Sequence, residues 1–213
     1  MHSNAHRSIS NMGDRMKRVF AQVVFVFMVT VGIANADNGI LLVDVAPFKS
    51  EIELKKKIQA QLESGGIEWG QTGNRIVFTT VNKRFINFDV NQFTRYGTQK
   101  SLELPAGDYL ITCAGLIVHT AFSPEKILSK GGYFNENIVT AHVEAGKTTT
   151  LKIEPVIRKQ NTVFMSFFMP DLLTSTILDG TESEQVSLNA QTDKSIKWDD
   201  YSGDLKFKAA SKK

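Results

Sequence analysis

The stretch LELPAGDYLITCAG, residues 102–115, places an Ala-Gly pair directly before a run of apolar residues. The same arrangement returns in HVEAGKTTTLKIEP, residues 142–155. Proline at the second position of a turn presets φ, and glycine tolerates positive φ, so both pairs read as turns. No helical pattern follows either glycine, which argues against a phosphate-binding loop. We therefore interpret both pairs as architecture that delivers the chain into strands.

Apolar patterning predicts a mainly β chain. The run from Tyr109 to Val118 is apolar at both parities, which indicates a strand in the centre of a sheet or under a further layer. Gly115 within it suggests a bulge. Residues 138–144 and 148–157 alternate between apolar and polar side chains, as in a half-buried antiparallel pair. Further strands are expected at 40–46, at 75–81 and 84–90 as a hairpin, and at 162–168 before Pro170, with loops at 91–99 and 123–137.

One amphipathic helix is expected after the first strand, over residues 51–64. Ser50 and Glu53 match a capping box, and Gly65-Gly66 supplies a stop. The apolar stripe of this helix is narrow, which places it across the edge or end of a sheet. Its members are Leu54, Ile58 and Leu62.

The two turn motifs and the glycine-bearing loop KGGYFNENI between them resemble the second half of immunoglobulin-like or transthyretin-like β-sandwich modules of exported bacterial proteins. The resemblance covers residues 101–156. It implies an antiparallel β-sandwich. It also implies a non-enzymatic role, because members of that family are mostly accessory, adhesive or carbohydrate- and protein-binding modules.

The N-terminus has the pattern of a secretory signal over residues 16–36. Lys17 and Arg18 precede an apolar run from Val19 to Ile33, and Ala34-Asn35-Ala36 follows with small residues at the peptidase positions. A membrane anchor is the alternative, but the run is shorter than the ~20 residues that cross a bilayer. We expect cleavage between Ala36 and Asp37, a periplasmic or secreted product and no membrane span in it. Residues 1–15 read as an upstream extension, with Met1, Met12 and Met16 as candidate starts.

Removal of this segment changes the charge balance. Residues 1–36 hold four of the 25 basic and one of the 22 acidic residues, so 21 of each remain. A nucleic-acid partner needs a basic field, and none is left. Lys55 to Lys57 read as the solvated face of the helix.

The remaining chain is expected to form one sandwich domain over 37–173 and a polar, flexible tail over 174–213. Few large apolar residues occur beyond Asp179, which favours a tail. A small hairpin around DDYSGD, between Trp198 and Phe207, is the alternative.

Candidate chemical groups are few. Cys113 lies in an apolar run and is expected to be a buried, inert thiol, with an intermolecular disulfide or a reactive thiol as alternatives. His142 is expected on a solvated strand face. Cu(I) ligation by His119, Met165 and Met169 is an alternative to core filling by the methionines.

The pairs of acidic residues do not indicate a catalytic site either. Asp199-Asp200 lies in the expected tail, and Glu51 with Glu53 lies at the expected start of the helix, where carboxylates favour the dipole. We therefore assign no catalytic, cofactor or metal residues. The leading hypothesis is a non-catalytic exported protein that binds an envelope protein or a glycan. The alternatives are a secreted effector or surface protein, and an enzyme with a loop-assembled site and a lid at Gly131 to Phe134.

The signal interpretation predicts the N-terminus of the exported protein. Expression of the full chain with a C-terminal tag, followed by Edman sequencing of the secreted or periplasmic form, should give Asp37 as the first residue. A precursor that keeps Val19 to Ile33 and stays in the membrane fraction would show that the segment is an anchor.

Overall fold

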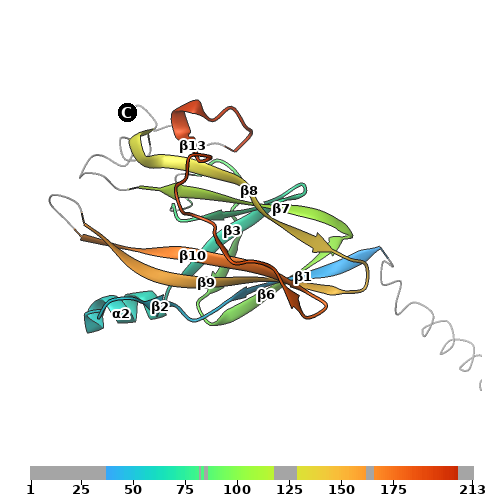
Figure 1. Ribbon diagram of the computed structural model, residues 1–213, viewed down its shortest axis with the longest axis horizontal. Helices are drawn as coiled ribbons and strands as arrows, with labels where there is room; N and C mark the ends of the chain where they lie inside the picture. The colour runs from blue at the N-terminus through green and yellow to red at the C-terminus, as the bar shows by residue number, and fades with distance from the viewer. Residues whose placement is uncertain (1–36, 82, 84–85, 118–128, 162–165, 206–213) are drawn as a thin grey trace, which may run out of the picture. The chain divides into compact units, whose positions relative to one another are not determined.

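Two mixed β-sheets pack against each other and enclose the core (Figure 1). The structure, a computed structural model, describes residues 37–81, 83, 86–117, 129–161 and 166–205, and all of them belong to one unit, Asp37–Lys213. Sheet A has the order β11-β10-β9-β1-β6, with β2 beside β9 and β12 beside β10. Sheet B has the order β13-β8-β7-β4-β3-β5.

The elements have these bounds in chain order: β1 Asn38–Val45, β2 Lys49–Ser50, α2 Lys56–Glu63, β3 Gly66–Thr72, β4 Arg75–Thr79, β5 Gln92–Arg95, β6 Thr98–Pro105, β7 Gly107–Leu116, β8 Gly132–Val143, β9 Thr148–Asn161, β10 Ser166–Leu178, β11 Thr181–Glu182, β12 Val186–Ser187, β13 Ile196–Lys197 and the 3₁₀ turn η2 Trp198–Asp200. A mainly β, sandwich-like fold is thus confirmed. A purely antiparallel one is not, because β1 and β2 each pair parallel with β9, and β4 pairs parallel with β7.

Both Ala-Gly turns carry the chain from one sheet to the other. The turn at Ala106 leads from β6 in sheet A to β7 in sheet B, and the turn at Gly146 leads from β8 in sheet B to β9 in sheet A. The expected antiparallel pairing of residues 138–144 with 148–157 is therefore wrong. Alternation shows that one face of each strand is buried, but it does not say which strand lies beside it.

The start of β1 lies between the two turns and is bonded to both. Ala106 N–H donates to the carbonyl of Asp37, and Gly146 N–H donates to the carbonyl of Asn38, each at 2.8 Å. Gly39 is so close to β8 that a Cβ on it would lie 2.1 Å from the carbonyl oxygen of Glu144. β1 then runs along the middle of sheet A, antiparallel to β6 and parallel to β9.

The main core forms between the facing sheets. Sheet A contributes side chains from β1 and β9, and sheet B contributes a stacked Trp69–Phe78 pair, whose ring centroids lie 5.8 Å apart. β7 has two strands on one side and three on the other in sheet B, and residues 111–115 are all buried. The prediction of a central, two-sided strand is confirmed. The irregularity in its pairing lies between Ile111 and Cys113, whereas Gly115 accommodates the ring of Tyr133.

The predicted hairpin of residues 75–81 with 84–90 is not formed, because residues 75–79 pair with another strand. β4 turns back onto β3, and residues 86–90 form no ladder, although Ile86 and Val90 are buried and Asn87 and Asp89 are exposed as the alternation predicted. Residues 84–85 lie outside the described part of the chain. The expected loop at 91–99 contains β5 and the start of β6, and the expected loop at 123–137 contains, from residue 132, the first half of β8.

The helix is shorter than predicted. It begins at Lys56, because Ser50 pairs in β2 and its hydroxyl exchanges hydrogen bonds with the backbone of Ile52 and caps no helix. Leu54, Ile58 and Leu62 are the half-buried residues of the segment, which confirms the narrow stripe.

The chain beyond Pro170 is folded over its described part. β10 continues through Pro170 to Leu178, and residues 181–200 add β11, β12, β13 and η2. Leu188, Tyr201 and Leu205 are buried, so the expected flexible tail is wrong for residues 174–205. The short polar segments of this region show no apolar periodicity in the sequence, because their contacts are made largely by side-chain amides and hydroxyls. Residues 162–165 and 206–213, with Phe207, lie outside the described part.

The contact at Gly39 predicts a large effect of one methyl group. Gly39→Ala should lower the free energy of unfolding by about 3 kcal/mol, because the methyl meets backbone that cannot move without shifting β8. Urea denaturation measures the change. The control Gly180→Ala, with φ +78° and open space around it, should cost about 1 kcal/mol. Equal costs would contradict the close approach.

Candidate functional site

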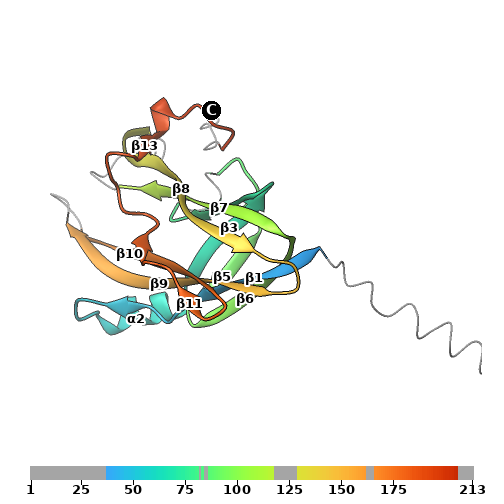
Figure 2. The same cartoon turned by 45° about the vertical axis from the view of Figure 1, so that its right-hand side comes forward.

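The segment from Val186 to Ser195, here called the strap, bridges one side of the sandwich. It leaves β12 on sheet A and reaches β13 on sheet B, as the orange-red trace in Figures 1 and 2 shows. Leu188 anchors it: its side chain is 0% exposed in the main core, and its N–H donates to the carbonyl of Leu172 at 2.9 Å. The strap therefore holds the two sheets together on this side.

Two asparagines fasten the strap, one to each sheet. The amide of Asn189 donates to the carbonyl of Pro170 at 2.8 Å and accepts from the N–H of Leu172 at 2.7 Å, so it acts as a short strand on the edge of β10. Asn135 of β8 donates to the carbonyls of Leu188 and Ala190, both at 2.9 Å. These bonds also explain how β10 passes Pro170, because a side chain occupies the edge at this point.

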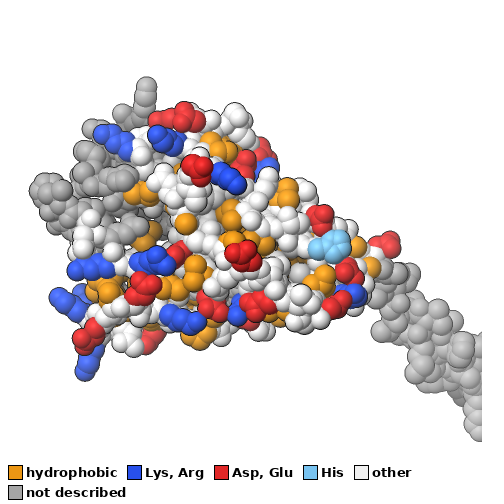
Figure 3. Space-filling view, viewed as in Figure 1, with side chains coloured by type: hydrophobic (Ala, Val, Ile, Leu, Met, Phe, Trp, Pro, Cys, Tyr) orange, Lys and Arg blue, Asp and Glu red, His pale blue; other side chains and the backbone are white. Residues whose placement is uncertain are grey.

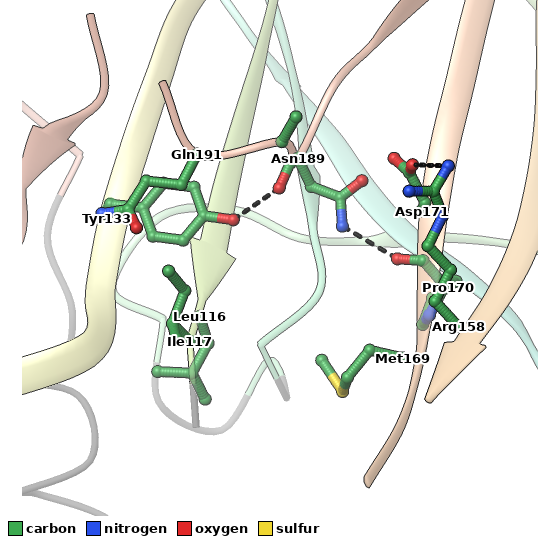
Figure 4. Close-up of a pocket in the computed structure, with 10 residues that line it drawn as sticks. Leu116, Ile117, Tyr133, Arg158, Met169, Pro170, Asp171, Asn189 and Gln191 are labelled. Carbon is green, nitrogen blue, oxygen red and sulfur yellow. Dashed lines mark hydrogen bonds and ion pairs between the residues drawn. The ribbon is translucent and has the colours of Figure 1, made fainter. Parts of the chain in front are cut away.

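A pocket of about 290 Å³ opens beside the strap, between the ends of the two sheets (Figure 4). Tyr133 of β8 stands on one side, and Met169 and Pro170 of β10 stand on the other. The apolar part is completed by Leu116 and Ile117 from the end of β7. The arrangement is typical of ligand pockets, in which apolar walls carry a few oriented polar groups.

The polar groups of the pocket hold each other in place. The hydroxyl of Tyr133 donates to the carbonyl of Asn189 at 2.6 Å. Asp171 accepts from the hydroxyl of Ser187 and lies 3.1 Å from Nη2 of Arg158. Burial raises the pKa of Tyr133, and the nearby Cys113 and Asp171 add to the rise. Tyr133 therefore stays protonated at neutral pH.

A second pocket, of about 330 Å³, shares Met169 and Pro170 with the first. Tyr96 and Phe93 line it, and Phe93 is 49% exposed. Positive and negative side chains are mixed over the face seen in Figure 3, with hydrophobic atoms exposed between them. The second pocket thus presents apolar surface, and the face seen in Figure 3 shows no field of one sign.

The structure separates the residues that the sequence singled out. Cys113 is 0% exposed, and burial raises its pKa to about 12, which confirms a buried thiol. His142 is exposed, as predicted, and its Nδ1 lies 2.6 Å from a carboxylate oxygen of Asp108 on β7. Met169 lines both pockets. His119 and Met165 lie outside the described residues, so their copper hypothesis is not tested.

The suggested lid is wrong. Gly132, Tyr133 and Phe134 start β8 and are buried, with exposed fractions of 3% for Tyr133 and 0% for Phe134. Their apolar and aromatic side chains fill the second core cluster and the pocket wall. A glycine pair at the start of a strand resembles a loop in sequence, which explains the misreading.

The remaining acidic pairs do not line the pocket, although Glu51 lies 3.9 Å from Nη2 of the pocket residue Arg158. Asp199 and Asp200 form the exposed part of η2, and Glu51 and Glu53 are exposed in the segment before α2. Among the described residues, no group of three or more His, Cys, Asp or Glu side chains is arranged to hold a metal ion.

Asn135, Asn189 and Arg158 organise the pocket and the strap, and no sequence motif marks them. A lone asparagine in a polar segment carries no periodic signal. The folded partners of Asn189, residues 170 and 172, are 17 or more positions away. Only the tertiary fold brings these groups together.

Removal of the Asn189 amide should loosen the strap. Asn189→Ala leaves the N–H of the buried Leu172 and the carbonyl of Pro170 without their partner, so we expect a loss of about 2 kcal/mol in the free energy of unfolding. Gln191→Ala, an exposed neighbour, should stay within about 0.5 kcal/mol. If both variants have the same free energy of unfolding as the wild type, the hydrogen bonds of Asn189 do not stabilise the fold.

Cys113 should report on unfolding. Because the thiolate is the reacting species, iodoacetamide should label the native protein at least about 100-fold more slowly than the protein in guanidinium chloride. Mass spectrometry of timed samples measures this ratio. Rapid labelling of the native state would mean that the centre of β7 is accessible.

Comparisons with known proteins give no relative for this chain: no family model, no curated protein and no solved structure matches it. Within the described residues, no helix has the length and apolar character needed to span a membrane. Function must therefore be argued from the site itself.

Proposed function

We propose that the protein is a non-catalytic binding module of the bacterial cell envelope, periplasmic or secreted, whose partner is an envelope protein or a glycan. The proposal rests on the pocket beside the strap. The immunoglobulin-like or transthyretin-like resemblance of residues 101–156 and the signal-like segment at 16–36 are consistent with it.

The state of the polar groups in the pocket carries the proposal. General acid–base catalysis needs a group whose pKa lies near the working pH. Burial raises the pKa of Tyr133 further above that range. Asp171 is engaged by Ser187 and Arg158. These groups are set to orient a ligand rather than to exchange protons with it.

Two side chains of the pocket, Gln191 and Arg158, can offer hydrogen-bond donors to a partner. The side chain of Gln191 is exposed at the rim and has no hydrogen bond to any described residue. Arg158 is half-exposed, and only its Nη2 contacts carboxylates, at 3.1 Å to Asp171 and 3.9 Å to Glu51. Donors at the rim above an apolar floor suit a polar chain with an apolar group, as in a peptide or a sugar.

Site-specific crosslinking in cells tests the proposal. A photoreactive residue at Gln191, on the pocket rim, should capture a specific envelope component from the exported protein. The same residue at Gln99, exposed on β6, should capture little of it. Mass spectrometry and glycan staining identify the product.

Two results would contradict this function. One is the absence of any product above background from either position, with the protein folded and exported. The other is turnover of a substrate by the purified protein that is lost in Arg158→Ala. Either would show that recognition of an envelope partner at this pocket is not the role of the protein.

A further inference from the structure

The free edge of β8 lies on the same side of the sandwich as the strap. β13 pairs with only two residues of β8, Tyr133 and Phe134. Beyond them the strand continues to Val143, paired on one side with β7 and with no described strand on the other. A strand edge of this kind presents backbone donors and acceptors to any extended chain that approaches it.

The ladder shows which backbone groups are unpaired. In β7, Leu110 N–H donates to Asn74, on the β4 side, so the neighbouring Tyr109 and Ile111 bond to β8. Their partners are Ala141 and Val139, and the backbone of Thr140 and His142 therefore points outward. The carbonyl of His142 accepts the hydroxyl of Thr149. The N–H groups of Thr140 and His142 and the carbonyl of Thr140 have no partner among the described residues.

The chain protects another long edge but not this one. On β6, Lys100 lies opposite the buried Val43, which puts a charge on the core-facing side of the edge, and Pro105 removes a donor. Both features discourage strand addition. Residues 138–143 of β8 contain neither lysine nor proline, and Thr140 and His142 are exposed.

A groove of about 450 Å³ continues this edge. Glu136, Asn137 and Ile138 of β8 form one wall, and Val186, Ala190 and Lys194 of the strap side form the other. Asn137 adopts φ +54°, a left-handed conformation at the point where the β7–β8 register shifts, so the strand changes direction at the groove.

We propose that this edge binds an extended peptide segment of a partner protein, which adds as a strand beside Thr140 and His142 and continues into the groove. The inference rests on the proposed function and specifies its partner as a protein. The unpaired backbone groups complement another extended backbone. Residues of the strap line the far side of the groove, so an extended chain that enters it would lie between β8 and the strap. Ile138, Val186 and Ala190 favour an apolar side chain there.

Selection of random peptides displayed on phage against residues 37–213 tests the proposal with a defined probe. Enriched peptides should be extended and carry an apolar residue. Their affinity should fall at least about tenfold in Thr140→Pro, which removes one outward N–H and leaves the bonds to β7 intact. The matched control Ser101→Pro makes the same change on the outward edge of β6 and should bind like the wild type.

Three results would overturn the proposal: no enriched peptide on the folded protein, equal affinity of the peptides for Thr140→Pro, or a wild-type dimer that Thr140→Pro alone dissociates, because a second copy would then hold the edge. If Thr140→Pro does not fold, Thr140→Lys places a charge on the same edge and should weaken binding in its stead. In cells, a partner that Thr140→Pro captures as well as the wild type does would remove this inference and leave the proposed function intact.

Discussion

The position of Gly39 constrains the rest of the structure. The chain enters β1 between two turns, and the carbonyl of Glu144 lies where any side chain would have to go. The bonds from Ala106 and Gly146 hold this entry point, and each turn exchanges the chain between the sheets. β1 consequently has neighbours on both sides, with β6 antiparallel and β9 parallel. The mixed pairing in sheet A follows from this arrangement, because a strand inserted between the two crossovers cannot be antiparallel to both neighbours.

The chain also crosses from sheet A to sheet B at the strap. There the sheets are joined by side chains, with Asn189 bonded to β10 and Asn135 bonded to the strap. Leu188 supplies the apolar contact. Closure of this side by a strap in place of a full strand leaves two features beside it, the pocket at Tyr133 and the unpaired edge of β8. Both proposals about function therefore concern one side of the molecule, and both depend on the strap.

Sequence patterns predicted which strands bury a face, but they did not predict which strands pair with each other. The two-sided apolar run from Tyr109 was correctly placed in the centre of a sheet, and both Ala-Gly pairs were correctly interpreted as turns. The antiparallel pairing of 138–144 with 148–157 was wrong, since burial of one face is compatible with any neighbour. The polar segment after Thr174 was misread as a tail because amide and hydroxyl contacts such as those of Asn189 have no periodicity. For the same reason none of the pocket's polar groups could be foreseen.

Hydrogen exchange of individual amides in the free protein, measured by NMR, tests most directly whether the edge beside the strap is open. If the edge is open, the amides of Thr140 and His142 exchange at rates close to those of an unstructured peptide. The amides of Val139 and Ala141, bonded to β7, should be protected at least about 100-fold, as expected for a core ladder. Equal protection of all four amides would mean that another part of the chain already covers the edge, and would contradict the account.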